Sequence, residues 1–559
     1  MKGLFFMYAP IRRFNLIVAL FALVLGLSFP VQAASESSSA PAQKRGEASL
    51  YQDMFDQSVY YEGTNLLRFD RIYRKLFRKK LRALDVNAFD EVPDSGFFQN
   101  RQGRKKLSGE ELQWGVHETP GPDLSGPLTI FYAEAEANPP KFWVLDGKGE
   151  EYLLKFDPQD SLELATSAEV IANRFYHAMG YNVFQETLAV FPSEKLTVGN
   201  GAMIYDSTGF KKIFTPEKLQ ELVLFIPADN QGHLRAAVIK LPKTAGAGGW
   251  SFTGLRPKNP EDTIEHAKRR SIRALQVFGA WLNNDDTRTS AASTQMDGDK
   301  KTARYYLTDF DSALGAGNQG PKPPMLSHEH MVDYGETAKA FLAFGFWEKP
   351  WQKRWREADE KIHSSAVGYF DNRYFDPAKF KTQLPYYAFK DLTLADGFWA
   401  AKTILSFSDE DIRVIVKSGQ YSDVNDEKYV ADTLIERRLL IGRYWLDKAN
   451  SLDEFDVRGN KLVFKDLAVQ YGFVPDGKSS YRVDVIEKLG SEAVPAGGKK
   501  GKKIASLDVQ EPAVSLQPEW TSGSAYLLIR TLRPGASKPS PYVLVTLGPK
   551  GVTGISHQD

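Results

Sequence analysis

The chain has 559 residues and not one cysteine, although it begins like an exported protein. Residues 1–33 place Arg12 and Arg13 before an apolar run at 16–29 and end at Ala33, the pattern of a secretory signal that is cleaved near Ala33. An exported chain without cysteine has no disulfides, no thiolate metal site, no cysteine nucleophile and no lipidated-cysteine anchor. Its fold must therefore be stabilised by packing, and we expect a periplasmic or secreted protein.

Composition excludes several classes for the rest of the chain. Apolar residues make up 42% and aromatic residues 12%, which is enough to build hydrophobic cores and excludes a disordered, coiled-coil or collagen-like protein. Apart from the leader, no apolar run approaches the ~20 residues of a spanning helix. The 71 basic and 70 acidic residues nearly balance, so we expect no nucleic acid among the partners.

The periodicity predicts an α+β protein. Period-two runs on either side of Asp146-Gly147 predict a hairpin, and a helix over 166–179 should stop at Gly180. Strands are expected at 222–227, 234–241 and 303–310, a long helix at 262–282, and mostly helix at 391–446. Short strands and turns dominate after Ser451.

These elements divide the chain into six expected segments. They are a signal peptide at 1–33, a small-residue tether at 34–48, an N-terminal helical extension at 49–125, two lobes at 126–225 and 226–450, and a β-sandwich-like domain at 451–559.

A basic amphipathic helix is predicted at 66–81 in the extension. Phe69, Ile72, Tyr73 and Leu76 share one face, and arginines and lysines cover the others. Two interpretations follow: peripheral contact with an anionic lipid or polysaccharide surface, or an ordinary docked helix whose basic side is solvated.

Four charged residues stand at or near the ends of apolar elements: Lys155, Glu169, Asp286 and Asp309. Phosphoryl transfer uses such a set, because a strand lysine neutralises nucleotide phosphates, a helical glutamate orients that lysine, one aspartate orients the attacking hydroxyl, and another binds Mg²⁺. Each residue also has a structural explanation. Glu169 and Thr166 fit a capping box, Lys155 fits an exposed strand lysine, and the aspartates fit turn or helix-end positions.

The chain order of these residues is that of the protein-kinase fold, and residues 141–446 resemble the atypical branch of the protein-kinase-like superfamily that includes HipA and the secretory-pathway kinases. A closer likeness is to a group of uncharacterised exported bacterial proteins with that core. It lies in the segments EVPDSGFFQNR, YLLKFDP, SAEVIANRFYHAMGYNV, FTGLRPKNPEDTIEHAKRRSIRALQVFGAWLNNDD, YYLTDFDSALG and FWAAKTILSFSDEDIRVIVKSGQYSD.

The resemblance implies a two-lobed kinase-like core, with ATP and Mg²⁺ or Mn²⁺ as cofactors. Lys155 and Glu169 would serve the nucleotide phosphates, Asp286 would be the catalytic-loop aspartate, and Asp309 would bind the metal. Asp311 and Asp285 are additional carboxylates that could assist there.

Two departures from the family pattern leave the activity open. Ala291 stands where such families place a metal-binding asparagine, and the predicted turn AEAEANPPKF contains no glycine to approach a triphosphate. The sequence therefore supports two functions: phosphoryl transfer to a protein or sugar hydroxyl, or an inactive kinase-like module that binds a protein or saccharide partner in the cell envelope.

Other candidate sites are weaker. His328 and His330 alternate on a loop and do not match a zinc motif. Trp347, Trp351 and Trp355 could stack a sugar ring, but tryptophans four residues apart are more often packing residues.

Overall fold

The computed structural model describes most of the chain, and no structure is assigned here to the remainder. The described residues are 54–61, 69–76, 80–135, 139–205, 210–242, 248–256, 259–288, 292–296, 303–317, 319–358, 362–488, 501–536 and 538–558. The predicted signal peptide and tether both lie outside these ranges.

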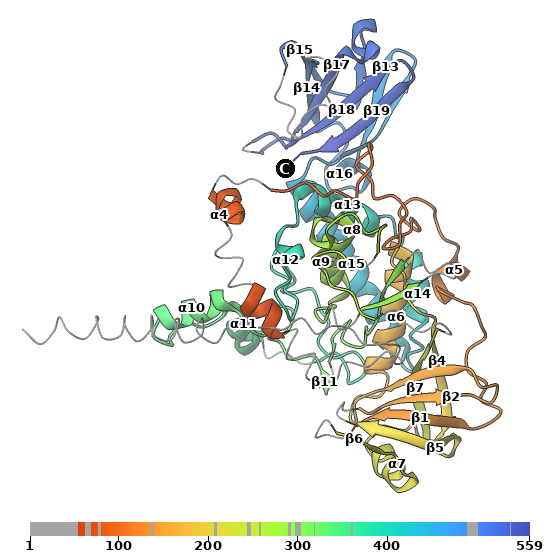
Figure 1. Cartoon of the computed structure of the whole chain (residues 1–559). Coiled ribbons are helices and arrows are strands. Elements are labelled where there is room, and N and C mark those ends of the chain that lie inside the picture. Colours follow the sequence, from red (N-terminus) through yellow and green to blue (C-terminus); the bar gives the residue numbers. More distant parts are fainter. Residues whose placement is uncertain are drawn as a thin grey trace, which may run out of the picture. The chain divides into compact units, whose positions relative to one another are not determined.

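A mixed sheet of seven strands is the largest element of the fold, with the strand order β4-β7-β3-β2-β1-β5-β6 (Figure 1). Its strands are β1 (Leu128–Glu134), β2 (Lys141–Leu145), β3 (Glu151–Phe156), β4 (Glu186–Pro192), β5 (Leu196–Tyr205), β6 (Lys211–Ile213) and β7 (His233–Lys240). The predicted hairpin is confirmed, because β2 pairs antiparallel with β3 around a turn in which the Gly149 amide donates to the Asp146 carbonyl. Buried side chains of the sheet form a hydrophobic cluster together with Leu219 and Leu222.

The strand predicted at 222–227 is wrong. Helix α7 (Pro216–Val223) ends there, and Thr215 caps its N-terminus by accepting a hydrogen bond from the Lys218 amide. A threonine followed by proline is a strong helix start, which outweighs the apolar content of the following residues.

Helix α6 (Leu164–Met179) follows the β3 strand and is confirmed, beginning two residues earlier than predicted. It stops at Gly180, whose φ of +120° favours glycine. The Asp157 carboxylate caps its first turn by accepting from the amides of Glu163, Ala165 and Thr166 at 2.8–2.9 Å.

A second and larger hydrophobic cluster joins α6 to the helices α9 (Leu275–Leu282), α13 (Leu394–Leu405), α14 (Asp409–Lys417) and α15 (Val424–Lys448). The helical prediction for 391–446 is confirmed, including Ser408 as an N-cap in a capping box with Asp411. Phe97 and Phe98, which precede the sheet in the chain, are buried in the same cluster.

The continuous helix predicted at 262–282 is wrong. It is divided into the short turn η3 (His266–Lys268), α8 (Arg270–Arg273) and α9. Asp262 instead accepts from His266, Arg269 and the Arg256 amide, and Arg269 has an extended backbone. These polar contacts replace the helical hydrogen bonds of the first two turns.

Short elements connect these parts. They are η1 (Asp56–Tyr61), α4 (Phe69–Leu76), α5 (Gly109–Trp114), η2 (Ser193–Lys195), β8 (Ala292–Met296), β9 (Ala303–Leu307), β10 (Ala316–Gly317), β11 (Gly320–Pro321), α10 (Tyr334–Leu342), α11 (Pro350–Ala358), α12 (Tyr387–Lys390), α16 (Leu467–Gln470) and η5 (Trp520–Ser524). The predicted strand at 303–310 ends three residues early, as β9.

The basic amphipathic helix is shorter than predicted. Of residues 66–81, helix α4 covers 69–76, and Lys80 and Leu81 are not helical. Phe69, Ile72, Tyr73 and Leu76 are exposed, so the apolar face is not buried as a docked helix would require.

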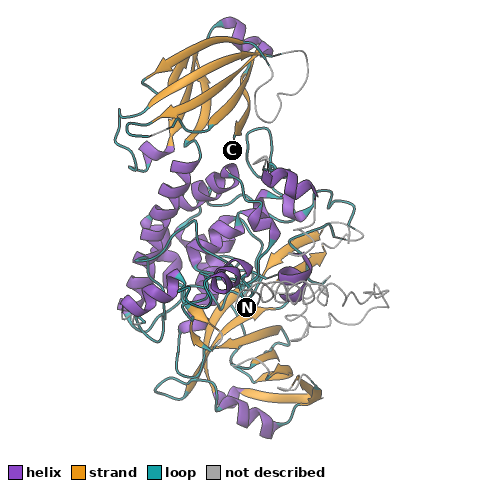
Figure 2. Cartoon of the chain, turned by 90° about the vertical axis from the view of Figure 1, so that its left-hand side faces the viewer, coloured by secondary structure: helices purple, strands orange, loops and turns teal. Residues whose placement is uncertain are grey.

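The tail from Leu452 to His557 is built from strands (Figure 2). One sheet has the order β12-β13-β16 and the other β15-β14-β17-β18-β19. The strands are β12 (Leu452–Arg458), β13 (Lys461–Asp466), β14 (Ser480–Glu487), β15 (Lys503–Val509), β16 (Ala513–Ser515), β17 (Ala525–Leu532), β18 (Tyr542–Gly548) and β19 (Gly551–His557). Both sheets contribute to one hydrophobic cluster of their own, while the predicted boundary at 451 stays a prediction.

A buried ionic junction ties this tail to the start of the core. Asp90 pairs with Arg270 at 2.9 Å, and its carboxylate accepts from the His557 amide at 2.9 Å. The His557 ring lies 3.0 Å from the same carboxylate, and Arg82 lies 3.1 Å from it. Among the described helices, none is long and apolar enough to cross a bilayer.

We expect the Asp90 junction to make the free energy of unfolding depend on pH in the acidic range. Burial raises the pKa of Asp90, but Arg270, His557 and Arg82 outweigh it, and the net pKa lies well below its usual value. The stabilisation is then complete above about pH 4, and it is lost as the pH falls below the pKa of an aspartate in the unfolded chain. Asp90→Asn should lower the free energy of unfolding by about 3 kcal/mol at pH 7, with the difference shrinking toward pH 2.

Urea titrations at several pH values measure this dependence. The control is Asp508→Asn, which breaks the exposed pair with Arg482 in the tail and should change little. A loss for Asp90→Asn that is the same at pH 7 and pH 2 would contradict the assignment.

Candidate active site

Lys155 stands at the centre of a buried ionic cluster. Its Nζ lies 2.9 Å from Glu169 Oε2, 2.5 Å from Asp309 Oδ1 and 3.4 Å from Asp311 Oδ2. On β3 its neighbours Leu154 and Phe156 belong to the core of the sheet, and alternation along the strand turns Lys155 to the opposite face, toward α6. The ammonium thus joins three carboxylates from two separate segments of the chain.

Glu169 enters the cluster from α6, where its side chain is 1% exposed. Oε2 accepts from Lys155 and also from the Phe310 amide at 3.0 Å, while the buried Oε1 has no hydrogen-bond partner among the described residues. Burial raises the pKa of Glu169 to about 7, and Lys155 opposes that rise. The expected approach of Lys155 and Glu169 is confirmed, and the capping-box alternative is wrong because Asp157 caps α6.

The segment Asp309-Phe310-Asp311 is held in an unusual conformation. Asp309 has φ +70°, which is uncommon for a residue other than glycine and marks a position held by its surroundings. Phe310 is buried and stacks on Tyr176 of α6, with ring centroids 5.0 Å apart. The buried ring fixes the segment, so that the carboxylates on either side both reach Lys155.

Two further cations, which the sequence analysis did not single out, compensate these carboxylates. Lys141, at the start of β2, lies 3.5 Å from Asp309 and 3.7 Å from Asp311. Burial favours a higher pKa for Asp309, but Lys141, Lys155 and Arg288 outweigh it and hold that pKa well below its usual value. Asp309 is therefore ionised, and the pKa of Lys155 is correspondingly raised by Asp309, Asp311 and Glu169 despite its burial.

Asp286 is connected to the cluster through Arg288. The Arg288 Nη2 donates to Asp286 Oδ2 at 2.8 Å and lies 3.8 Å from Asp309 Oδ2. Burial raises the pKa of Asp286 to about 7, although Arg288 opposes the rise. Asp285 points to another partner: Lys322 bonds its carboxylate and donates to the carbonyls of Asn283 and Ser312, both at 2.6 Å. Asp285 is therefore not available to the cluster.

The carboxylates offer a site for a divalent cation. One oxygen each of Glu169, Asp309 and Asp311 lies within 4.8 Å of the others, and this is the one such acidic or histidine group in the described ranges. The buried, unbonded Oε1 of Glu169 fits a cation, and carboxylate oxygens suit Mg²⁺ and Mn²⁺. Lys155 contacts all three residues, so a cation would have to share them with its ammonium.

Most residues of this site were predicted from the sequence, but not all. Lys155, Glu169, Asp309 and Asp311 come together, and Asp286 joins them through an arginine. Arg288 could have been predicted because it lies two residues after Asp286 in the sequence. Lys141 begins the strand segment KFWVL, and nothing in that segment indicates a site residue. Ala291 lies outside the described residues, and His328 and His330 belong to no metal group within them.

We expect Lys155→Met to destabilise the protein more than Lys141→Met. Lys155 is 7% exposed and is the cation in contact with Glu169, so its removal leaves a buried carboxylate uncompensated, at a cost of about 3 kcal/mol. Lys141 is 24% exposed and contacts only the two aspartates, so we expect less than about 1 kcal/mol. Urea denaturation at pH 7 measures both, and equal losses would show that the pair with Glu169 is not the stabilising contact.

Comparison with known proteins finds distant similarities only. No family model matches the sequence, and no curated protein matches it. Among solved structures, the proinflammatory kinase CtkA of Helicobacter pylori is 12% identical, with a TM-score of 0.28, over 55% of this chain and 94% of that one.

The Golgi casein kinase is similar over 76% of this chain and 94% of its own, at 9% identity and a TM-score of 0.27. Its structure with Mn and ADP bound is 8% identical, with a TM-score of 0.26, over 75% and 94% of the two chains. These similarities are too distant to place the chain in a family.

Proposed function

We propose that the protein is an exported phosphotransferase with a kinase-like catalytic centre, which moves a phosphoryl group from a nucleotide to a hydroxyl acceptor. The observation that carries the proposal is the position of the Lys155 ammonium between Glu169 and Asp309 at 2.9 and 2.5 Å. A strand lysine, a helical glutamate and a metal-type aspartate are the charged set that phosphoryl transfer requires.

Each residue of the cluster has a distinct role in this proposal. Lys155, oriented by Glu169, would bind a phosphate oxygen, and Lys141 supplies a second positive charge on the same side. A bound Mg²⁺ or Mn²⁺, held by Glu169, Asp309 and Asp311, would neutralise charge on the transferring group. Arg288, which already lies between Asp286 and Asp309, joins the acceptor side to the metal side.

Asp286 would orient the acceptor. Its carboxylate accepts the proton of the attacking hydroxyl while the oxygen of that hydroxyl bonds to the terminal phosphorus. The bond from that phosphorus to the bridging oxygen breaks, and the nucleoside diphosphate leaves with the electron pair. This assigns the metal-side and acceptor-side chemistry to different carboxylates.

The alternative is a kinase-like module that binds a partner in the envelope without catalysis. One observation favours it: the Lys155 ammonium is already satisfied by three carboxylates and needs no phosphate. Ala291 and the glycine-free turn before β2 point the same way. The two functions differ in one measurable property, namely a metal-dependent response to nucleotide.

We expect ATP with Mg²⁺ or Mn²⁺ to raise the melting temperature of the wild-type protein. Asp309→Asn should abolish the metal-dependent part of the shift, since it removes a ligand. Asp286→Asn should keep the shift and lose transfer of phosphate to an acceptor, because its carboxylate acts only on the hydroxyl. Thermal shift and a radiolabelled-ATP transfer assay measure the two properties separately.

Asp432→Asn is the matched control, because this carboxylate of α15 pairs with Arg413 and Lys428 and has no role in the cluster. Ala291→Asn, which adds the side chain that the kinase pattern expects, should leave activity unchanged or increase it. If wild type shows no nucleotide-dependent shift with either metal, and Ala291→Asn creates none, the binding module is the correct function.

A further inference from the structure

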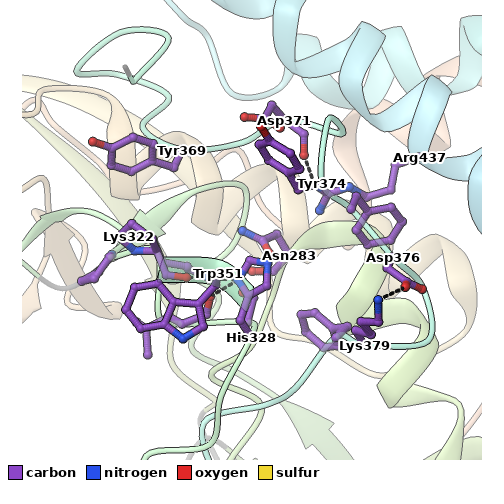
Figure 3. A pocket seen from close by; sticks show the side chains of 16 residues that line it. Asn283, Lys322, His328, Trp351, Tyr369, Asp371, Tyr374, Asp376, Lys379 and Arg437 are labelled. Atoms are coloured by element: carbon purple, nitrogen blue, oxygen red, sulfur yellow. Dashed lines mark hydrogen bonds and ion pairs between the residues drawn. The ribbon is translucent and has the colours of Figure 1, made fainter. Parts of the chain in front are cut away.

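A pocket lies beside the loop that carries Asp285 and Asp286 and is not part of the ionic cluster (Figure 3). It encloses a cavity of about 110 Å³. Five parts of the chain line it: Asn283 of the loop, residues within 322–328, Trp351 of α11, residues within 369–380, and Arg437 of α15. None of the roles proposed above uses this cavity.

Aromatic rings form much of its wall. They are Trp351, Tyr369, Tyr374, Phe375 and Phe380. In Figure 3 the Trp351 indole lies on one side of the pocket and the Asp376–Lys379 pair on the other, with Asn283 between them. Flat apolar faces opposite polar groups suit a ligand that has both kinds of surface.

Arg437 ties together residues along one side of the pocket. Arg437 is 3% exposed and donates to Asn372 Oδ1 at 2.8 Å and to the Asp371 carbonyl at 2.7 Å. Its guanidinium also lies 4.2 Å from the centroid of the Phe375 ring. Such contacts hold the neighbouring aromatic side chains in place before a ligand arrives, which lowers the entropic cost of binding.

Most of the charges around the pocket are compensated by one another. Lys379 pairs with Asp376 at 2.9 Å, Asp371 pairs with Arg373 at 3.1 Å, and Lys322 bonds Asp285. Arg437 adds one positive charge, but it is 3% exposed and donates to Asn372 and to the carbonyls of Ala280 and Asp371, so it offers little to an ionic ligand. The Asp371 carboxylate accepts from the Arg373 amide at 2.9 Å and from the Arg373 guanidinium at 3.1 Å. An ionised carboxylate has about four acceptor sites, so it can also accept from a hydroxyl group.

The enclosed part of the pocket holds only part of a ring. An apolar cavity of about 150 Å³ accommodates a single benzene ring. The present cavity is smaller but opens to solvent, so a saccharide ring would lie partly in its open mouth. We infer that this pocket binds one neutral saccharide ring, with its apolar face on Trp351 and a hydroxyl donating to Asp371.

The position of the pocket gives the ring a place in the reaction. Asn283 lines it three residues before Asp286, and Lys322 both lines it and bonds Asp285. Asp286 itself does not line the pocket, so a saccharide held here would be the acceptor only through a hydroxyl that extends beyond the lining toward Asp286, a part of the inference that rests on the proposed function. The binding itself does not depend on nucleotide.

Ligand-observed saturation-transfer NMR with glucose, galactose and N-acetylglucosamine as probes tests the inference on the full chain. At least one probe should bind wild type, and Trp351→Ala should weaken that binding about 10-fold by removing the ring platform. Trp347→Ala is the matched control: Trp347 lies four residues earlier, bonds Glu336 at 2.9 Å, does not line the pocket, and should leave binding unchanged.

Asp371→Asn provides a second variant if Trp351→Ala does not fold, and it should weaken binding about 5-fold through loss of an ionised acceptor. Failure of all three sugars to bind wild type, equal binding by the pocket variants, or binding of an aromatic peptide in place of sugar would each overturn the inference.

Asp309→Asn separates the two proposals, because it should lose the nucleotide shift and keep the sugar signal. Sugar binding without any nucleotide response would refute the phosphotransferase and leave the saccharide site standing.

Discussion

The contact between Lys155 and Glu169 is the interaction on which the site depends. Lys155 belongs to a strand of the seven-stranded sheet and Glu169 to a helix of the larger hydrophobic cluster, and their 2.9 Å contact joins these two parts. Burying either charge alone would cost several kcal/mol. Because each compensates the other, two hydrophobic units can meet around a polar centre.

The remaining charges of the centre follow from that contact. Glu169, Asp309, Asp311 and Asp286 supply four carboxylates, and Lys141, Lys155 and Arg288 supply three cations. The cluster is thus nearly neutral as it stands, and it can accept a divalent cation and a polyphosphate together without a large change of charge. Either ligand alone would leave an imbalance inside a poorly hydrated site.

Much of the fold could be predicted because local signals were strong. Asp146-Gly147, Gly180 and Ser408 each marked a turn or a helix end through backbone chemistry that neighbouring residues cannot override. The order of Lys155, Glu169, Asp286 and Asp309 located the site before any distance was known. Where prediction was wrong, polar side-chain contacts within the segment decided: Asp262 accepts from His266 and Arg269, and the first turns of the expected helix are lost.

Other parts of the site could not be predicted because the contacts that define them exist only in the folded chain. Lys141 is an ordinary strand residue until the fold brings Asp309 within 3.5 Å, a contact across 168 positions of sequence. In the sequence Asp157 has the pattern of a turn residue. Only the structure shows that three amides at the start of α6 donate hydrogen bonds to its carboxylate.

The Asp157 cap limits how helix α6 can move. Asp157 follows Lys155 by two residues and holds the first turn of α6, while Arg235 of β7 bonds Thr166 and Ser167 of that turn at 2.9 Å. Strand and helix are therefore clamped at the end nearest the ion pair, and α6 cannot rotate about its axis or swing outward without breaking buried hydrogen bonds. A switch in this protein cannot work by withdrawing Glu169 from Lys155. The Asp309 segment is held differently, by the buried Phe310 ring, by the hydrogen bond from the Phe310 amide to Glu169 and by ion pairs, and it is the better candidate for a moving part because ion pairs can exchange for a bound cation.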